Sequence, residues 1–335
     1  MKFGVAIVPQ WPAKEVLGLV QLADEAGFDN AWICDQTFFA DPFPLLTAAG
    51  QKIKHIQLGV GVTNPYTRPA YQVARSAGVV GEILGAPINL GIGAGNRREL
   101  LLPLGMEQTA PATRIREMIE ITRRLLDGET VTYESENVTL KNVKLDFQAS
   151  QPVKMFVAAR GPTTLQLSGE IGDGVIIGDL ISNAGLAYAF EEINKGLKKS
   201  GRGRNNLETI SWTTCFVTDK GNDVETTRAI RPWVAHNLAA SPAVVQAALG
   251  MDQDRVEVMR SAYAKGGAEE AGKYVEAEDI DKLSIMGSPE RCAETIKRIS
   301  AQGIDQLSIL MFSKKIEENT RLIRRLSEEV FPRVK

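Results

Sequence analysis

Short apolar runs alternate with longer amphipathic stretches along the 335-residue chain. The runs are rich in Val, Ile, Leu and Ala, as expected of strands that are covered on both faces. The stretches between them repeat apolar residues at helical spacing. The pattern predicts eight strands, at residues 3–8, 31–34, 56–61, 88–92, 155–159, 174–177, 210–217 and 306–311.

Helix boundaries carry their own signals. Gly27 ends the stretch 13–26, and Ser288-Pro289 begins a later helix with an N-cap followed by proline. Eight strands with helices between them are the pattern of a (β/α)8 TIM barrel, an α/β fold. The further predicted helices span residues 69–84, 112–126, 162–171, 184–199, 289–301 and 316–330.

Two stretches interrupt the alternation. Residues 128–150 contain alternating apolar and polar positions and predict a β-hairpin before the fifth strand. Residues 240–284 are polar, rich in Ala and helical, and lie between the seventh and eighth strands. Because neither stretch is long or apolar enough for its own core, we expect residues 1–335 to form a single barrel domain with two insertions.

Composition narrows the choice of partners. Hydrophobic residues make up 44% of the chain and charged residues 24%, with a net charge of −2. A nearly neutral chain has no electrostatic reason to bind nucleic acid or an anionic membrane. No apolar stretch approaches the roughly 20 residues of a membrane helix. We therefore expect a cytoplasmic protein that binds a small-molecule substrate.

The chain is poor in the residues that build metal sites and catalytic triads. It has two His and three Cys, so a zinc site is not expected and no metal ligands are predicted. The cysteines, without a C-x-x-C pair, are expected to be free buried thiols. His55 precedes the third strand and His236 falls in the helical segment after the seventh, so neither is expected to act as a general base. A cofactor would then carry the chemistry of an enzyme.

Barrel active sites lie at the C-terminal ends of the strands. Asp35 and Gln36 follow the second strand, and Asp35 could act in acid–base catalysis or simply cap the next loop. Gly91, at the end of the fourth strand, is followed by Gly93 and Gly95, where a dinucleotide motif would need glycine in place of Asn96. These glycines suit the close approach of a flat ring or a phosphate.

The fifth strand leads into Arg160-Gly161-Pro162, which opens a helix. A helix N-terminus with an adjacent arginine can bind an anion. The alternative is an exposed arginine at a helix start. Arg97 and Arg98 leave a similar choice between an anion contact and a solvated loop.

Five segments resemble the luciferase-like flavin- and deazaflavin-dependent oxidoreductases, especially the branch that includes the F420-dependent methylenetetrahydromethanopterin reductase. The segments are MKFGVAIVP, GFDNAWICDQ, LGVGVTNPYTRPA, GIGAGN and ARGPTTLQLSGEIGDGVIIG. The resemblance implies a (β/α)8 barrel that holds coenzyme F420, or alternatively FMN, at the C-terminal mouth. It also implies a homodimer or a higher homo-oligomer.

The same resemblance assigns roles to individual residues. It implies a non-proline cis peptide at Gly61-Val62 that lies against the ring, with Asp35 and Gln36 on the substrate side. Polar contacts to the ring edge or ribityl chain are expected from Thr63, Asn64 and Asn96. The cofactor phosphate is expected near Ala159, Arg160, Gly161 and Gly178.

Three departures limit what the resemblance implies about the reaction. Ala6 and Asn96 stand where relatives of this branch carry acidic residues, and Gln36 stands where related dehydrogenases carry His. None of the three titrates near neutral pH. The expected function is hydride transfer between F420 and an organic substrate. An FMN-dependent monooxygenase and a non-catalytic flavin-binding barrel remain as alternatives.

Overall fold

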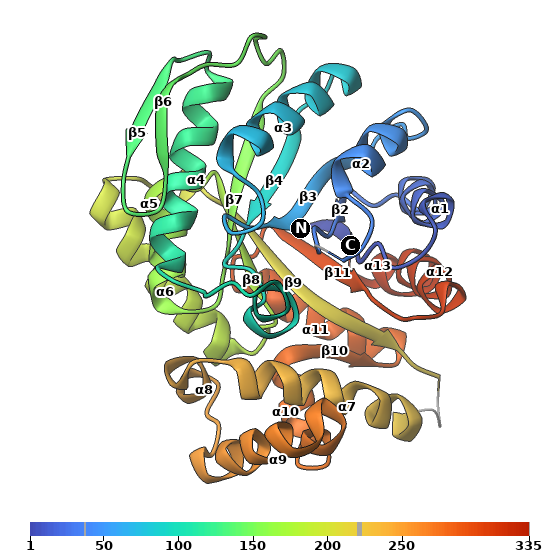
Figure 1. Cartoon of the computed structure of the whole chain (residues 1–335). Helices are drawn as coiled ribbons and strands as arrows, with labels where there is room; N and C mark the ends of the chain where they lie inside the picture. The colour runs from blue at the N-terminus through green and yellow to red at the C-terminus, as the bar shows by residue number, and fades with distance from the viewer. Residues whose placement is uncertain (37, 220–222, 335) are drawn as a thin grey trace.

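The computed structural model describes residues 1–36, 38–219 and 223–334. Eight parallel strands pair in order and close where β8 meets β9 and β11 meets β1 (Figure 1). This closed sheet confirms the predicted barrel. Its strands are β1 (Lys2–Ile7), β2 (Asn30–Ile33), β3 (Gln57–Thr63), β4 (Ile88–Ile92), β7 (Val153–Ala159), β8 (Gly174–Gly178), β9 (Glu208–Val217) and β11 (Gln306–Met311).

Helices surround the barrel between successive strands. Those predicted from helical spacing are present. The predicted helix 316–330 ends as a π-helical turn (Leu326–Val330), and α13 (Phe331–Val334) continues beyond it. The surrounding helices are α1 (Ala13–Glu25), α2 (Pro42–Gly50), α3 (Ala70–Leu84), α4 (Pro111–Leu126), α5 (Pro162–Ile171), α6 (Asn183–Ser200), α11 (Pro289–Ala301) and α12 (Ile316–Arg325).

The helix α2 and the strand β10 (Ser284–Gly287) are among the elements that the sequence did not predict. The helix α2 is nearly all apolar and has no polar face, so helical spacing does not reveal it. Its start does carry a signal, because Asp41 accepts a hydrogen bond from Phe43 N at 3.0 Å and Pro42 follows the cap. The short strand β10 pairs with the outer half of β9, directly after the helical insertion.

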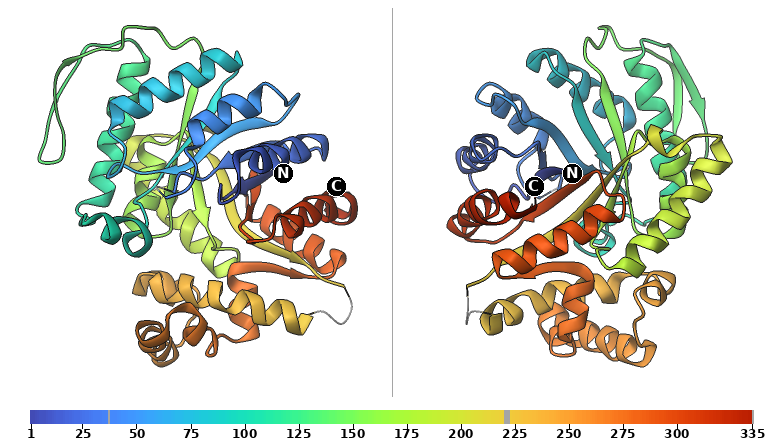
Figure 2. Two further views of the ribbon diagram at one scale, coloured as in Figure 1. Left: turned by 45° about the vertical axis from the view of Figure 1, so that its right-hand side comes forward. Right: turned by 180° about the vertical axis from the view of Figure 1, so that it is seen from behind.

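Both insertions are present, but the helical one begins before the predicted residues 240–284. The first forms the antiparallel pair β5 (Val131–Glu134) and β6 (Thr139–Val143). The second continues from α7 (Asp223–Ala240) through α8 (Ala243–Ala248), α9 (Gln253–Gly272) and α10 (Ala277–Leu283), and these helices gather on one side of the barrel in every view (Figures 1 and 2).

Aromatic side chains fill the barrel interior. Trp32 and Phe156 meet edge to face at 5.4 Å, and Trp212 lies 6.2 Å from Trp32 between ring centroids. Ala6 is fully buried in this cluster. A Cβ at Gly61 would lie 2.7 Å from Trp212 Cη2, so glycine there lets the tryptophan approach the strand.

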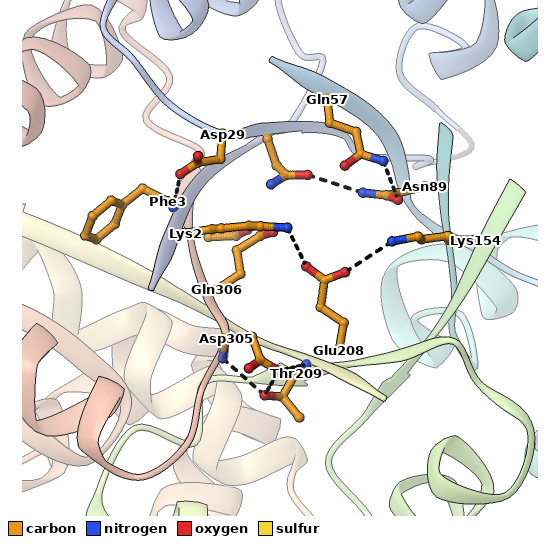
Figure 3. A network of polar contacts seen from close by, with 12 residues as sticks. Lys2, Phe3, Asp29, Gln57, Asn89, Lys154, Glu208, Thr209, Asp305 and Gln306 are labelled. Atoms are coloured by element: carbon orange, nitrogen blue, oxygen red, sulfur yellow. Dashed lines mark hydrogen bonds and ion pairs between the residues drawn. The ribbon is translucent and has the colours of Figure 1, made fainter. Parts of the chain in front are cut away.

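The N-terminal end of the barrel is closed by paired polar side chains (Figure 3). Glu208 lies 3.4 Å from Lys2 Nζ and 3.8 Å from Lys154 Nζ. Thr209 Oγ1 donates to Asp305 Oδ2 at 2.9 Å and accepts from Asp305 N at 3.2 Å. Next to them, Gln57 donates to Asn89 at 3.1 Å and Asn89 donates to Asn30 at 3.3 Å.

Cys34, Cys215 and Cys292 are free and buried, as predicted. Among the helices of the described ranges, none combines the length and the apolar character that spanning a membrane requires.

Candidate functional site at the barrel mouth

The end of β3 carries the backbone feature that the resemblance implies. The peptide bond Gly61-Val62 is cis, and the pairing of β3 with β4 shifts between Val60 and Thr63. Thr63 is fully buried, and its Oγ1 has no hydrogen-bond partner among the described residues. A buried hydroxyl without a partner weakens the folded state, so its presence here points to a group supplied from outside the chain.

The glycines at the end of β4 and just after it pack against the side chain of Val62. A Cβ at Gly91 or Gly93 would lie 2.9 Å from a methyl carbon of Val62. These glycines therefore make room for Val62, and the expectation that they admit a ring or phosphate stays a prediction. Gly95 turns the chain with a φ of +72° next to Asn64.

Asn64 and Asn96 both have local partners. Asn64 Oδ1 accepts from the backbone N–H groups of Tyr66 and Thr67 at 3.0 Å. Asn96 Oδ1 accepts from Arg98 N at 3.0 Å and Glu99 N at 3.1 Å, which caps the π-helical turn Arg97–Leu101. Their contacts to a cofactor stay predictions, beside a structural role that the sequence did not indicate.

Asp35 is tied to an arginine of the next loop. Arg68 Nε donates to Asp35 Oδ2 at 2.6 Å and its terminal nitrogen donates to Oδ1 at 2.9 Å, while Asp41 accepts from the same arginine at 3.0 Å. Burial alone would lower the pKa of Arg68, but these carboxylates raise it. Exposed Gln36 lines, with Asp35 and Arg68, a cavity of about 150 Å³.

A larger cavity of about 870 Å³ lies outside the barrel, between α2, α3 and residues 144–147. It shares Arg68 and Asp41 with the small cavity beside Asp35. The strand-end residues predicted to hold the cofactor do not line it.

The ends of β7 and β8 bring together the residues expected near the phosphate. Ala159 is buried, and the side chain of Arg160 lies over Gly178, where a Cβ would be 3.5 Å from Arg160 Cδ. Gly161 is the N-cap of α5 and, within the described part of the chain, no side chain caps that helix. Uncapped N–H groups beside an arginine suit an anion.

Within the described ranges, the hydrogen-bond acceptors of the Arg160 side chain are Asn237 and Ser241. Its terminal nitrogens donate to Asn237 Oδ1 at 3.0 Å and Ser241 Oγ at 2.6 Å, while its buried Nε finds no partner within the described ranges. Burial lowers the pKa of Arg160, and the nearby charge of Asp179 acts in the opposite direction.

Asp179 follows β8 with a left-handed φ of +50°. Burial raises the pKa of its carboxyl to about 6, although the charge of Arg160 acts to lower it. The fold thus places a titratable carboxyl at the mouth although Ala6, Gln36 and Asn96 do not titrate near neutral pH.

The helix α7 adds side chains that sequence reasoning missed. Trp233 stacks on Phe312 at 5.1 Å beyond the end of β11, and His236 Nδ1 lies 2.7 Å from Tyr263 Oη. Burial lowers the pKa of His236, opposed by the charge of Glu99 and reinforced by Arg98 and Arg160. His236 thus lies near strand ends in space although it follows none in sequence. The spacing of residues 233, 236, 237 and 241 along one helical face was the available signal.

These observations test whether the residues fit a phosphate-bearing flavin or deazaflavin. Buried donors without partners in the described part of the chain include Thr63 Oγ1 at the end of β3, Arg160 Nε just after β7, and Trp212 Nε1 within β9, where Trp212 pairs with Gly178, the last residue of β8. An uncapped helix N-terminus adjoins Arg160. A ring edge and an anionic tail offer the acceptors that these donors lack, so the mouth fits such a cofactor.

Comparison with known proteins assigns the family. The model of the luciferase-like monooxygenase family matches residues 1–306. The chain belongs to this family, and the predicted family and fold are confirmed.

The relatives are oxidoreductases, in agreement with the predicted class of enzyme. The 5,10-methylenetetrahydromethanopterin reductase of Archaeoglobus fulgidus is 34% identical over 339 residues, covering 100% of both chains. The F420-dependent glucose-6-phosphate dehydrogenase of Nakamurella multipartita is 26% identical, covering 100% of this chain and 97% of that protein. The solved structure of the coenzyme F420 dependent tetrahydromethanopterin reductase from Methanopyrus kandleri superposes with a TM-score of 0.86 at 26% identity, covering 100% of this chain and 99% of that one.

Proposed function

We propose that this protein is an F420-dependent oxidoreductase that transfers a hydride between the deazaflavin and a small organic substrate. The observation that carries the proposal is a set of buried, unpartnered donors of the described chain: Thr63 Oγ1 at the end of β3, Arg160 Nε just after β7, and Trp212 Nε1 in β9 beside the end of β8. When bound, the deazaflavin supplies or accepts the hydride. We prefer F420 to FMN because two of the relatives described above, the glucose-6-phosphate dehydrogenase and the reductase of known structure, are named as dependent on F420.

In this proposal the chain positions the cofactor and excludes water. The Gly61-Val62 segment, packed on Trp212, supports the ring, and Thr63 bonds its edge. Arg160 and the first N–H groups of α5 bind the phosphate. Such fixed positions supply orientation, and the substrate meets a ring that is already in place.

The substrate side is proposed at Asp35 and Gln36. With both oxygens bonded to Arg68, Asp35 can hold the loop after β2 in place. A tetrahydropterin is the first substrate to test, because the relative with 34% identity is named for one. Ala6 and Asn96 supply no acid to protonate it.

The test is a pair of titrations of the protein, with F420 and with FMN, followed by cofactor fluorescence and thermal unfolding. We expect F420 to bind and to stabilise the protein by about 2.7 kcal/mol at a hundredfold excess over its Kd. Reduced F420 should then be oxidised in the presence of methylenetetrahydromethanopterin. Stabilisation by FMN but not by F420 would contradict the proposal and favour the monooxygenase alternative.

A further inference from the structure

Arg160 is held from the side opposite β7 by the last turn of α7. Its terminal nitrogens donate to Asn237 Oδ1 at 3.0 Å, to Asn237 O at 3.5 Å and to Ser241 Oγ at 2.6 Å. Asn237 and Ser241 are 77 and 81 residues away in sequence. The guanidinium of Arg160 therefore links the barrel to its helical insertion through hydrogen bonds.

The two acceptors are themselves fixed. Ser241 Oγ donates to Asn237 O at 2.7 Å, and Asn237 Nδ2 donates to Trp233 O at 3.1 Å. Ser241 O accepts from Gln246 Nε2 at 3.1 Å. Asn237 is 7% and Ser241 3% exposed, so water competes little for these bonds. Their orientation is set before any ligand arrives.

The charges agree with this arrangement. The C-terminal end of a helix carries partial negative charge and favours a cation, and α7 ends at Ala240, between the two acceptors. A guanidinium is planar and rigid, so bonds to its terminal nitrogens also fix the direction of Nε–H. That Nε is buried and lacks a partner among the described residues.

We propose that Asn237 and Ser241 are positioning residues, which hold the guanidinium of Arg160 so that its Nε–H is left for the phosphate of the cofactor. This inference rests on the proposed function, since it concerns the phosphate side of the same site. Gly161, next in the chain, begins α5, so the arginine and the helix N-terminus act on one anion. The insertion thus takes part in cofactor binding without touching the cofactor.

A purely structural role makes a different prediction. If the bonds to Arg160 only dock α7 on the barrel, their loss should weaken every ligand of the mouth alike. If they position Arg160, their loss should weaken only ligands that carry a phosphate. The presence or absence of the phosphate therefore separates the two roles.

The experiment titrates wild type, Asn237→Ala and Ser241→Ala with two deazaflavins, F420 and its analogue that ends at the ribityl hydroxyl. We expect each variant to lose roughly tenfold in affinity for F420, equivalent to about 1.4 kcal/mol. Affinity for the phosphate-free analogue should stay within about twofold of wild type. FMN and riboflavin form a second pair of probes with the same contrast.

Two matched variants serve as controls. Ser241→Thr keeps the hydroxyl and should retain F420 affinity, which keeps the test decisive if the alanine variant fails to fold. Thr227→Ala removes a polar contact between α7 and Met286. Thr227 lies far along α7 from Asn237, so this variant should change the affinity for neither deazaflavin. Unchanged F420 affinity in both alanine variants, or equal losses with and without phosphate, would overturn the inference. Failure of wild-type protein to bind F420 while FMN still shows the phosphate effect would overturn only the choice of cofactor.

Discussion

The two ends of the barrel treat polar groups differently. At the N-terminal end, Glu208 is paired with two lysines and Thr209 is bonded to Asp305, with Gln306 Oε1 a buried exception. At the C-terminal end, the described chain leaves Thr63 Oγ1 and Arg160 Nε unpartnered. Unpaired buried groups weaken a fold, so we infer that the C-terminal end is the one where stability is given up for binding.

The largest expected effect on stability is at Asp179, the buried carboxyl at the C-terminal end of the barrel, and Glu208 at the N-terminal end provides the comparison. Since burial raises the pKa of Asp179 to about 6 in the folded state, above 3.8 for the unfolded chain, the protonated carboxyl favours folding. This contribution is complete at low pH and is lost as the pH rises through about 6. Asp179→Asn should therefore raise the free energy of unfolding by about 3 kcal/mol near pH 8 and hardly change it near pH 4.

Glu208→Gln is the matched variant at the other end, where two lysines pair with the carboxylate at the protein surface. It should lower the free energy of unfolding by no more than about 1 kcal/mol. Urea unfolding at both pH values measures the two effects. A loss of stability in Asp179→Asn near pH 8 would show that Asp179 is paired after all.

The second prediction compares the cofactor affinity of variants at two cations, one near each end of β7. Arg160 follows β7 at the mouth, and Lys154 lies near its start at the closed end. Arg160→Gln should weaken F420 binding about a hundredfold, or ~2.7 kcal/mol, because the phosphate loses its cation. Lys154→Gln should leave the affinity unchanged. Equal affinities in fluorescence titrations of the two variants would remove Arg160 from the site.

The third prediction separates anchoring from proton transfer at Asp35. Asp35→Asn breaks a two-point ion pair with partly buried Arg68, so we expect a loss of about 2 kcal/mol in the free energy of unfolding. Turnover per folded enzyme should stay close to wild type if the carboxylate only anchors the loop. A pH-dependent fall in kcat with unchanged stability would instead assign Asp35 the acid–base role.

The smallest expected change in stability comes from a Thr-to-Val substitution made at each end of the barrel. Thr63→Val removes a buried hydroxyl that has no partner in the described chain and should add about 1 kcal/mol to stability while weakening the cofactor. Thr209→Val removes a hydroxyl bonded to Asp305 and should lower stability by about 1–2 kcal/mol. Melting temperatures that move in the same direction would erase the contrast between the ends.

The barrel strands could be predicted because each is a short apolar run, and apolar spacing survives without knowledge of the fold. The helix α2 was missed for the opposite reason, since Phe43, Leu45 and Leu46 are all buried and leave no polar face to set a period. Sequence position also indicated Arg160, which opens a helix after a strand.

The partners of Arg160 could not be predicted. Asn237 and Ser241 reach it only because the insertion packs against the mouth, across 77 and 81 residues of chain. Neither hydrophobic spacing nor local motifs carry such long-range information. His236 was set aside for the same reason, although α7 brings it near Arg98 and Glu99.

The most direct test of the central claim is a crystal structure of the protein soaked with F420. The account predicts the deazaflavin ring against Gly61-Val62 and its phosphate within hydrogen-bond distance of Arg160 Nε and the first turn of α5. Cofactor density in the outer cavity between α2 and α3, or at the lysine-rich N-terminal end, would contradict it.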